Sequence, residues 1–112
     1  MLDIGDVIEL IIDIPKQNLR AGIQGTIVHH HTPDDYEIEF VDSDGETIDL
    51  VVLRPEDFIA VWRSESGQWV TVQEQVASII ARLPDETAME LLDYARFLSV
   101  RRHKLARQRI SA

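Results

Sequence analysis

The sequence predicts an α+β protein in which a small antiparallel β-barrel precedes a two-helix hairpin. Residues 1–62 hold short runs of β-branched and aromatic residues between turn-forming residues, which is typical of an all-β unit. Residues 71–112 instead repeat apolar residues at spacings of three and four, which is typical of amphipathic helices. We therefore divide the chain into a barrel (1–62), a linker (63–70) and a helical hairpin with a basic tail (71–112).

Five strands are expected in the barrel. The run from Tyr36 to Val41 alternates strictly between apolar and acidic residues, which predicts a strand with one buried face. An Asp-Gly hairpin turn follows at Asp42 to Gly45, and Arg54 to Asp57 should form a short helical turn. A long first loop, a three-strand meander, a short turn and a last strand together fit an SH3-like barrel, and a closed barrel would leave few strand edges exposed. The five expected strands are Asp6 to Asp13, Thr26 to His30, Tyr36 to Val41, Thr47 to Leu53 and Phe58 to Trp62.

Two helices are expected after the linker. Thr71 and Glu74 form a capping-box pattern at the start of the first helix. Pro84 lies where a second helix tolerates proline, in its first turn. Acidic residues near the start of that second helix and basic residues near its end suit the helix dipole.

The apolar face of the second helix is wider than a two-helix hairpin can cover, because such a hairpin buries only one flank of the stripe. The exposed remainder would be an apolar patch of a size that soluble monomers seldom carry. We therefore expect a homodimer or higher homo-oligomer through these helices, or docking into the groove of a partner protein; packing within the same chain is the alternative. The candidate partner-binding and oligomerisation residues are Leu91, Leu92, Tyr94, Phe97, Leu98, Val76 and Ile80.

The net charge of −9 is unevenly distributed. Residues 1–62 hold 14 acidic and 3 basic residues, whereas residues 63–112 hold 6 acidic and 8 basic ones. An acidic barrel attracts a basic partner protein and repels phosphate backbones, so nucleic-acid binding is not expected of it. A charged surface that only keeps the protein soluble is the alternative. The candidates for nucleic-acid contact are Arg101, Arg102 and Lys104, near the end of the second helix.

Catalytic, cofactor and metal sites are not expected. The chain has no cysteine and no nucleotide-binding glycine loop. The most tempting metal cluster is His29, His30 and His31, but side chains alternate along a strand, so at most His29 and His31 share a face. We expect exposed strand-end histidines, with metal binding as the alternative. No run approaches the roughly 18 apolar residues of a membrane span, and a reducing cytoplasm is the simplest location.

The C-terminal half carries a recognisable motif. Leu83-Pro84-Asp85-Glu86 is followed by a helix that holds Leu-Leu-Asp-Tyr-Ala-Arg-Phe-Leu (Leu91 to Leu98) and then by Arg101-Arg102. With these features, the segment Val76 to Lys104 resembles the helical module of VapB-type antitoxin-like proteins. The DNA-binding swapped-hairpin domain that often precedes this module is not recognisable here, which argues against autoregulatory DNA binding.

The N-terminal half carries a second motif. It consists of Asp-Val-Ile-Glu-Leu (Asp6 to Leu10), Gly-Ile-Gln-Gly-Thr-Ile-Val (Gly22 to Val28) and the segment Tyr36 to Gly45. With these features, the segment Asp6 to Val61 resembles a family of short acidic bacterial domains of uncharacterised function. Members of that family look like components of small two-gene modules, which agrees with an antitoxin-like interpretation.

Together these observations predict a non-catalytic, antitoxin-like interaction protein. It would oligomerise through its C-terminal helices and bind a partner protein such as a basic toxin. Two alternatives are a nucleic-acid- or ribosome-associated adaptor and a small subunit or assembly factor of a larger complex.

Overall fold

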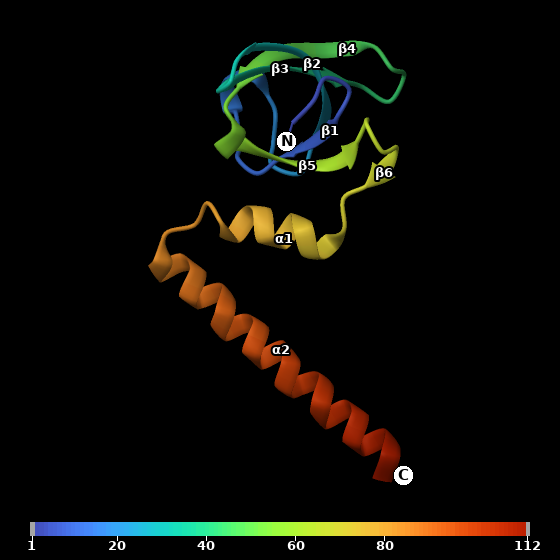
Figure 1. Ribbon diagram of the computed structural model, residues 1–112, viewed down its shortest axis with the longest axis vertical. Coiled ribbons are helices and arrows are strands. Elements are labelled where there is room, and N and C mark those ends of the chain that lie inside the picture. Colours follow the sequence, from blue (N-terminus) through green and yellow to red (C-terminus); the bar gives the residue numbers. More distant parts are fainter. Residues whose placement is uncertain (1, 112) are drawn as a thin grey trace. The chain divides into compact units, whose positions relative to one another are not determined.

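Figure 1 shows the computed structural model, which describes residues 2–111 and the side chains of residues 2–108. The chain divides into two compact units, Met1–Ile79 and Ile80–Ala112. The first unit holds the whole β-sheet and most of the first helix, and the second unit holds the long second helix. Sheet and helices thus follow one another along the chain, which confirms the predicted α+β class. The expected units began at Met1 and ended at Ala112, which both lie outside the described residues.

The strands form one antiparallel sheet of six strands, in the order β4-β3-β2-β1-β5-β6. In this order β1 lies between β2 and β5, while β2, β3 and β4 form a meander of consecutive strands. The three-strand meander was expected from the sequence, whereas β6 was not, and the bent sheet is compatible with an SH3-like barrel (Figure 1). The strands are β1 (Val7–Leu10), β2 (Gln24–Thr32), β3 (Asp35–Val41), β4 (Thr47–Leu53), β5 (Phe58–Arg63) and β6 (Gln68–Trp69).

The sheet does not close, so the expectation of a closed barrel was wrong. Strands β4 and β6 are the two ends of the sheet. The chain passes from β4 to β5 through the single 3-10 turn η2 (Pro55–Asp57), where the sequence predicted a helical turn, and β5 then pairs with β1 and β6. β4 therefore keeps one edge without a neighbouring strand in the described part of the chain, and it can accept another strand there.

The core lies on the inner face of the bent sheet. Along β3, Tyr36, Ile38 and Phe40 are buried, whereas Glu37 and Glu39 on the other face are half-buried. This confirms the alternation predicted from the sequence, since successive side chains of a strand point to opposite faces. The core residues are Ile8, Leu10, Leu19, Ile27, Tyr36, Ile38, Phe40, Val51, Leu53 and Phe58.

Gly25 in β2 allows the core to pack closely. A Cβ atom at this position would lie 2.8 Å from the ring of Phe40 and 2.7 Å from Cγ2 of Ile38. Both distances are shorter than van der Waals contact, so any larger residue would have to displace buried side chains. Gly25 is therefore required by packing rather than by an unusual backbone angle.

Asp6 ties the start of the sheet to the segment after β5. Its carboxylate is 1% exposed and accepts hydrogen bonds from the N–H groups of Asp3 (3.0 Å) and Ser64 (2.9 Å) and from the Ser64 hydroxyl (2.9 Å). Nη1 of Arg63 lies 3.7 Å from Oδ2. Burial alone would raise the pKa of Asp6, but these hydrogen bonds and the Arg63 charge outweigh it, so the pKa is lowered.

Residues 63–70, predicted as a polar linker, contain a short hairpin instead. β6 pairs Trp69 with Trp62 and Gln68 with Arg63 of β5, and Gly67 turns the chain with a φ of 66°. Val70 then donates its N–H to the carbonyl of Val61 (2.9 Å) and is buried. The segment is therefore part of the sheet unit.

Two helices follow, α1 (Val72–Ile80) and α2 (Asp85–Ser111). The hydroxyl of Thr71 accepts the N–H of Glu74 at 3.1 Å, which confirms Thr71 as the predicted N-cap. Pro84 directly precedes α2, and its carbonyl accepts the first-turn N–H of Ala88 at 2.9 Å. The pairing of the two helices into a hairpin stays a prediction. Neither helix, within the residues described, combines the length and the apolarity of a bilayer-spanning segment.

Candidate interaction surfaces

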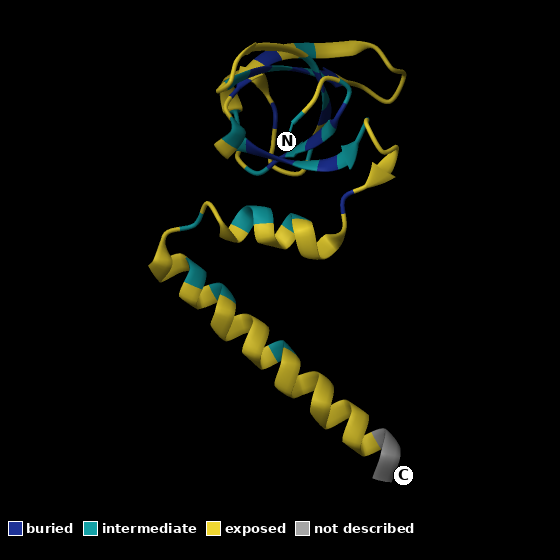
Figure 2. Cartoon of the chain, in the orientation of Figure 1, coloured by how far each residue is buried: buried dark blue, intermediate teal, exposed yellow. Residues whose placement is uncertain are grey.

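Helix α2 carries many exposed apolar side chains. Among residues 85–108, whose side chains are described, none is buried, although large apolar side chains recur along the helix. In Figure 2 the buried residues lie in the sheet unit, whereas the described residues of the two helices are exposed or half-buried. A helix this long depends on packing of an apolar face for most of its stability, so α2 carries a surface suited to a partner.

The residues predicted for this surface fall into two groups. Tyr94 and Phe97 are more than half exposed, at 59% and 56%, and Leu92 is also exposed. Leu91 and Leu98 are half-buried. On α1, Val76 is exposed, and Ile80 at the end of this helix is 37% exposed.

The apolar surface of α2 extends beyond the predicted residues. Val100 and Leu105 are both more than half exposed and belong to the same helix. The three-and-four spacing that identified Leu91 and Leu98 continues to Leu105. Extending this pattern along the sequence would therefore have identified Leu105 as well. The stripe predicted from the sequence ended at Leu98 and did not include these two residues.

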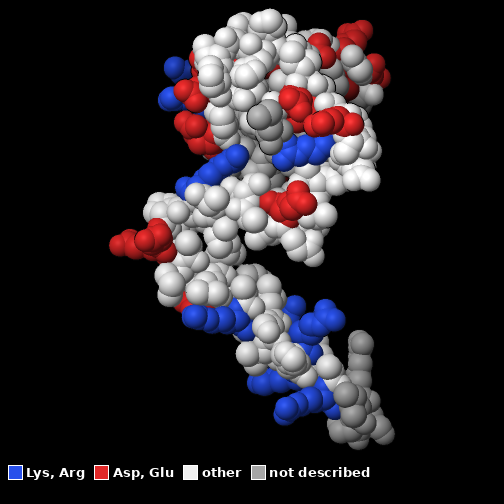
Figure 3. Space-filling model, viewed as in Figure 1, with Lys and Arg blue, Asp and Glu red and all other residues white. Residues whose placement is uncertain are grey.

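The predicted basic residues lie beside this surface. Cζ of Arg101 lies 5.9 Å from the centre of the Phe97 ring, within the range of a cation–π contact. Phe97, Val100, Arg101 and Lys104 line a shallow depression of about 220 Å³ on the helix surface. Arg102 is exposed on the same helix. Figure 3 shows the Lys and Arg residues gathered along α2, in contrast to the acidic residues of the sheet unit.

A second exposed apolar surface lies on the outer face of β4 and was not predicted. Ile48, Leu50 and Val52 alternate along this strand, and each is about half exposed. Val41, the last residue of β3, is exposed too. The run Thr47 to Leu53 was predicted only as the returning strand, and it carries apolar residues on both faces.

An acidic row lies next to this apolar row. Glu37 is the cross-strand partner of Val52, and Glu39 is the partner of Leu50. Glu39 accepts a hydrogen bond from the Thr47 hydroxyl at 3.0 Å. We call the five side chains Glu37, Glu39, Ile48, Leu50 and Val52 the β4 face. Apolar contact and negative charge side by side suit a partner strand that combines apolar and basic residues.

The three histidines lie on β2 and are exposed. The rings of His29 and His31 are 4.4 Å apart, which confirms that these two share a face, whereas His30 stacks on the Tyr36 ring at 4.4 Å. Nε2 of His31 lies 3.5 Å from Oε1 of Glu37. Three or more side chains able to hold a metal ion do not converge anywhere in the described residues.

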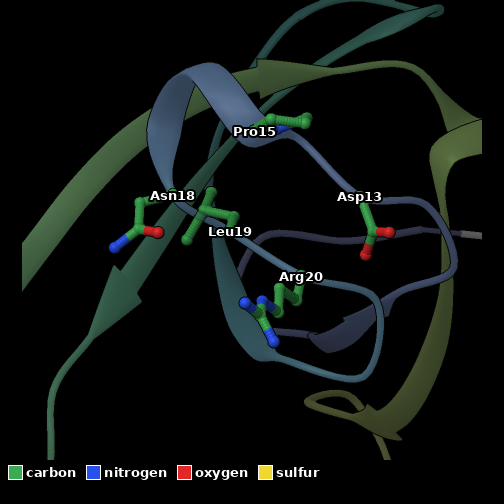
Figure 4. Close-up of a pocket in the computed structure, with 5 residues that line it drawn as sticks. All are labelled: Asp13, Pro15, Asn18, Leu19 and Arg20. Carbon is green, nitrogen blue, oxygen red and sulfur yellow. The ribbon is translucent and has the colours of Figure 1, made fainter.

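A pocket of about 390 Å³ lies in the first loop, around the 3-10 turn η1 (Pro15–Gln17). Figure 4 shows its lining, which consists of Asp13, Pro15, Asn18, Leu19 and Arg20. Oδ1 of Asp13 accepts the N–H of Ala21 at 2.8 Å, so this carboxylate closes the loop on itself. Asn18 adopts a left-handed conformation with a φ of 56°. The hydrogen bond from Ala21 gives the Asp13 carboxylate a structural role in this loop.

The turn at Asp42 to Gly45 shows the predicted hairpin chemistry. Oδ1 of Asp42 accepts the N–H groups of Asp44 (2.9 Å) and Glu46 (3.0 Å), and Gly45 has a φ of 81°. This arrangement satisfies the backbone of the turn through a local side chain. The acidic residues at this site therefore have a structural explanation.

Comparison with known proteins gives one family match. The family model described as a domain of unknown function (DUF4926) matches residues 4–60. No curated protein and no solved structure matches the chain. The match confirms that the N-terminal half belongs with domains of unknown function, as the motif from Asp6 to Gly45 predicted. Because it ends at residue 60, the resemblance of the C-terminal half to VapB-type proteins stays a prediction.

Proposed function

The chain belongs to the family described as a domain of unknown function (DUF4926), and from this premise we propose that it is a non-catalytic interaction protein. It assembles with further copies through α2 and binds a basic partner protein with its acidic sheet unit. The observation that carries the proposal is the exposed apolar surface of α2, since no side chain described in this helix is buried. Soluble proteins cover such surfaces with a partner.

The sheet unit supplies the second part of the proposal. Most of its charge is acidic, and the β4 face places an apolar row beside Glu37 and Glu39 at an edge that can accept another strand. Charge of one sign speeds the encounter with a partner of the other sign, while apolar contact holds the complex together. A partner with a basic, partly apolar strand fits both requirements.

An antitoxin-like role is the more specific form of this proposal. It is supported by the motif from Leu83 to Arg102 and by the acidic character of the sheet unit. In this form the partner is a basic toxin encoded next to this protein, and binding of its basic surface suppresses its activity. The cytoplasm is then the place of action.

Two measurements test the proposal. Light scattering on the full chain is expected to give the mass of at least two copies. Titration with the product of the adjacent gene is expected to show binding that weakens as the salt concentration rises. The Leu50→Ser variant should bind this partner more weakly, whereas Gln73→Ser, at an exposed position of α1, should not. A monomer that does not bind this gene product would refute the proposal.

A nucleic-acid-associated adaptor is a second candidate, supported by the depression on α2. It combines the Phe97 ring with Arg101 and Lys104, and aromatic rings beside cations are the usual means of binding single strands. Retention on single-stranded nucleic acid that falls steeply with salt would favour this candidate. Charge reversal at Arg101 and Lys104 should then abolish the retention.

A further inference from the structure

We propose that α2 pairs antiparallel with α2 of a second copy, an inference that rests on the proposed self-assembly and specifies its geometry. The contact line, which we call the seam, is a row of six residues on one side of the helix. The seam consists of Ala88, Leu91, Ala95, Leu98, Arg102 and Leu105.

The seam has the spacing of a coiled coil. Its residues follow one another at alternating steps of three and four, so they form a stripe that a second helix can follow over more than two heptads. Leu91, Leu98 and Leu105 occupy every seventh position, and no seam residue is buried in the single chain. Ala95, Arg102 and Leu105 are exposed and the other three seam residues are half-buried, so the seam is correctly spaced and only partly covered.

The distribution of charge selects the antiparallel orientation. All four acidic residues of α2 lie within residues 85–93, and all basic residues lie from Arg96 onward. A parallel pair would place like charges next to each other at both ends, which is unfavourable. An antiparallel pair places the acidic end of each helix beside the basic end of the other. Opposite charges then attract each other at both ends of the pair.

Side-chain size along the seam agrees with this orientation. In an antiparallel pair centred between Ala95 and Leu98, Ala95 faces Leu98 of the second copy and Ala88 faces Leu105 of the second copy. Each small residue then lies opposite a large one, which fills the space between the helices evenly. A parallel pair would place alanine against alanine and leave gaps.

The remaining positions are compatible with the same register. Arg102 faces Leu91 of the second copy, where its aliphatic stem covers the leucine and its guanidinium reaches the acidic end of the helix. Tyr94 and Arg101 flank the seam on the same side, so Tyr94 lies across from Arg101 of the second copy. An aromatic ring and a guanidinium at such a position attract each other.

Disulfide cross-linking tests the orientation directly, because the chain has no cysteine of its own. Thr87 and Gln108 both flank the seam, about 32 Å apart along the helix at 1.5 Å per residue. The variants Thr87→Cys and Gln108→Cys are oxidised separately and as a mixture. We expect a shift to twice the monomer mass in the mixture and no shift in either variant alone. Asp93→Cys mixed with Val100→Cys is the matched control, since both positions point away from the seam.

Each outcome separates orientation from self-assembly. Cross-linking of each variant with itself would show a parallel pair and overturn this inference, while the proposed self-assembly would stand. A doubled mass in light scattering without any cross-link, or with cross-links in the control mixture, would overturn the seam. A monomeric mass in light scattering would overturn both this inference and the self-assembly on which it rests.

Discussion

Replacing Asp6 by asparagine should destabilise the sheet unit strongly, although the two side chains have nearly the same shape. The Asp6 carboxylate is buried and accepts the N–H groups of Asp3 and Ser64 at 3.0 and 2.9 Å. The Ser64 hydroxyl has one proton and lies near two acceptors, Oδ1 of Asp6 and the carbonyl of Ile4. Only the hydrogen bonds from the backbone N–H groups of Asp3 and Ser64 are therefore counted fully toward the stability that Asp6 provides.

The expected cost follows from what asparagine keeps and loses. Its remaining oxygen can still accept the Ser64 N–H, but its NH₂ group faces the Asp3 N–H, which loses its acceptor. A hydrogen bond to a charged group contributes about 1.5–3 kcal/mol, and an unpaired buried donor adds to the loss. The attraction between Arg63 and this carboxylate is lost as well. We expect the free energy of unfolding to fall by about 2–4 kcal/mol.

The dependence on pH gives the prediction a second readout. The pKa of Asp6 is lowered from 3.8 in the folded state, so the folded chain binds this proton more weakly than the unfolded chain. The stabilisation is therefore complete above pH 3.8 and is lost as the pH falls through the lower folded pKa. The stability difference between the two proteins should be constant from about pH 7 to 5 and should shrink in more acidic solution.

Urea unfolding of both proteins across this pH range measures the difference. Asp44→Asn is the matched control, because Asp44 lies exposed in a turn and only its backbone N–H takes part in the hydrogen bonds of that turn. This control should change the free energy of unfolding by less than about 0.5 kcal/mol. A difference below that value for Asp6→Asn, or one that grows as the solution becomes more acidic, would refute the reasoning.

Three further variants test other parts of the structure. Gly25→Ala should lower the free energy of unfolding by about 1–3 kcal/mol in urea titration, because its methyl group meets the Phe40 ring; Gln24→Ala, next to it and exposed, should not. Thr71→Ala should lower the stability of α1 by about 0.5–2 kcal/mol and speed amide hydrogen exchange in the first turn of this helix. Leu50→Ser should leave the urea midpoint nearly unchanged, since this side chain is already half exposed.

Each of these variants has an outcome that contradicts its prediction. Equal stabilities of the alanine variants at Gly25 and Gln24 would mean that the core side chains rearrange around the added methyl group without loss of stability. Unchanged exchange in the Thr71→Ala variant would mean that α1 does not depend on its N-cap. A large loss of stability in Leu50→Ser would mean that the outer face of β4 is covered in solution.

The sequence predicted those features that leave a periodic signal. Tyr36, Ile38 and Phe40 alternate with acidic residues, so their strand and its buried face could be read directly. The N-cap Thr71 and the long helix after Pro84 could also be predicted, because caps, prolines and three-and-four spacing are signals that lie close together in the sequence. The exposed apolar surface of α2 followed from counting how much of the stripe a hairpin could bury.

Features that depend on distant contacts could not be predicted in this way. Strand β6 has only two residues, Gln68 and Trp69, and exists because β5 offers it an edge. The outer face of β4 was missed because apolar residues on both faces of a strand look the same whether the second face is covered or open. The role of Asp6 depends on Ser64, 58 positions later, which no local pattern indicates.

The open edge of β4 has a consequence for how this protein avoids aggregation. A strand with an apolar outer face at a sheet edge is a template for fibrous stacking. Here Oδ1 of Asp49 accepts the N–H of Leu50 at 2.8 Å, so a backbone donor of this strand is already engaged by a negative charge. An incoming strand that pairs with this N–H must displace that carboxylate, and a basic segment compensates the displaced charge better than a second copy of this acidic strand. We therefore expect Asp49 to disfavour stacking of identical strands more than pairing with a strand of opposite charge.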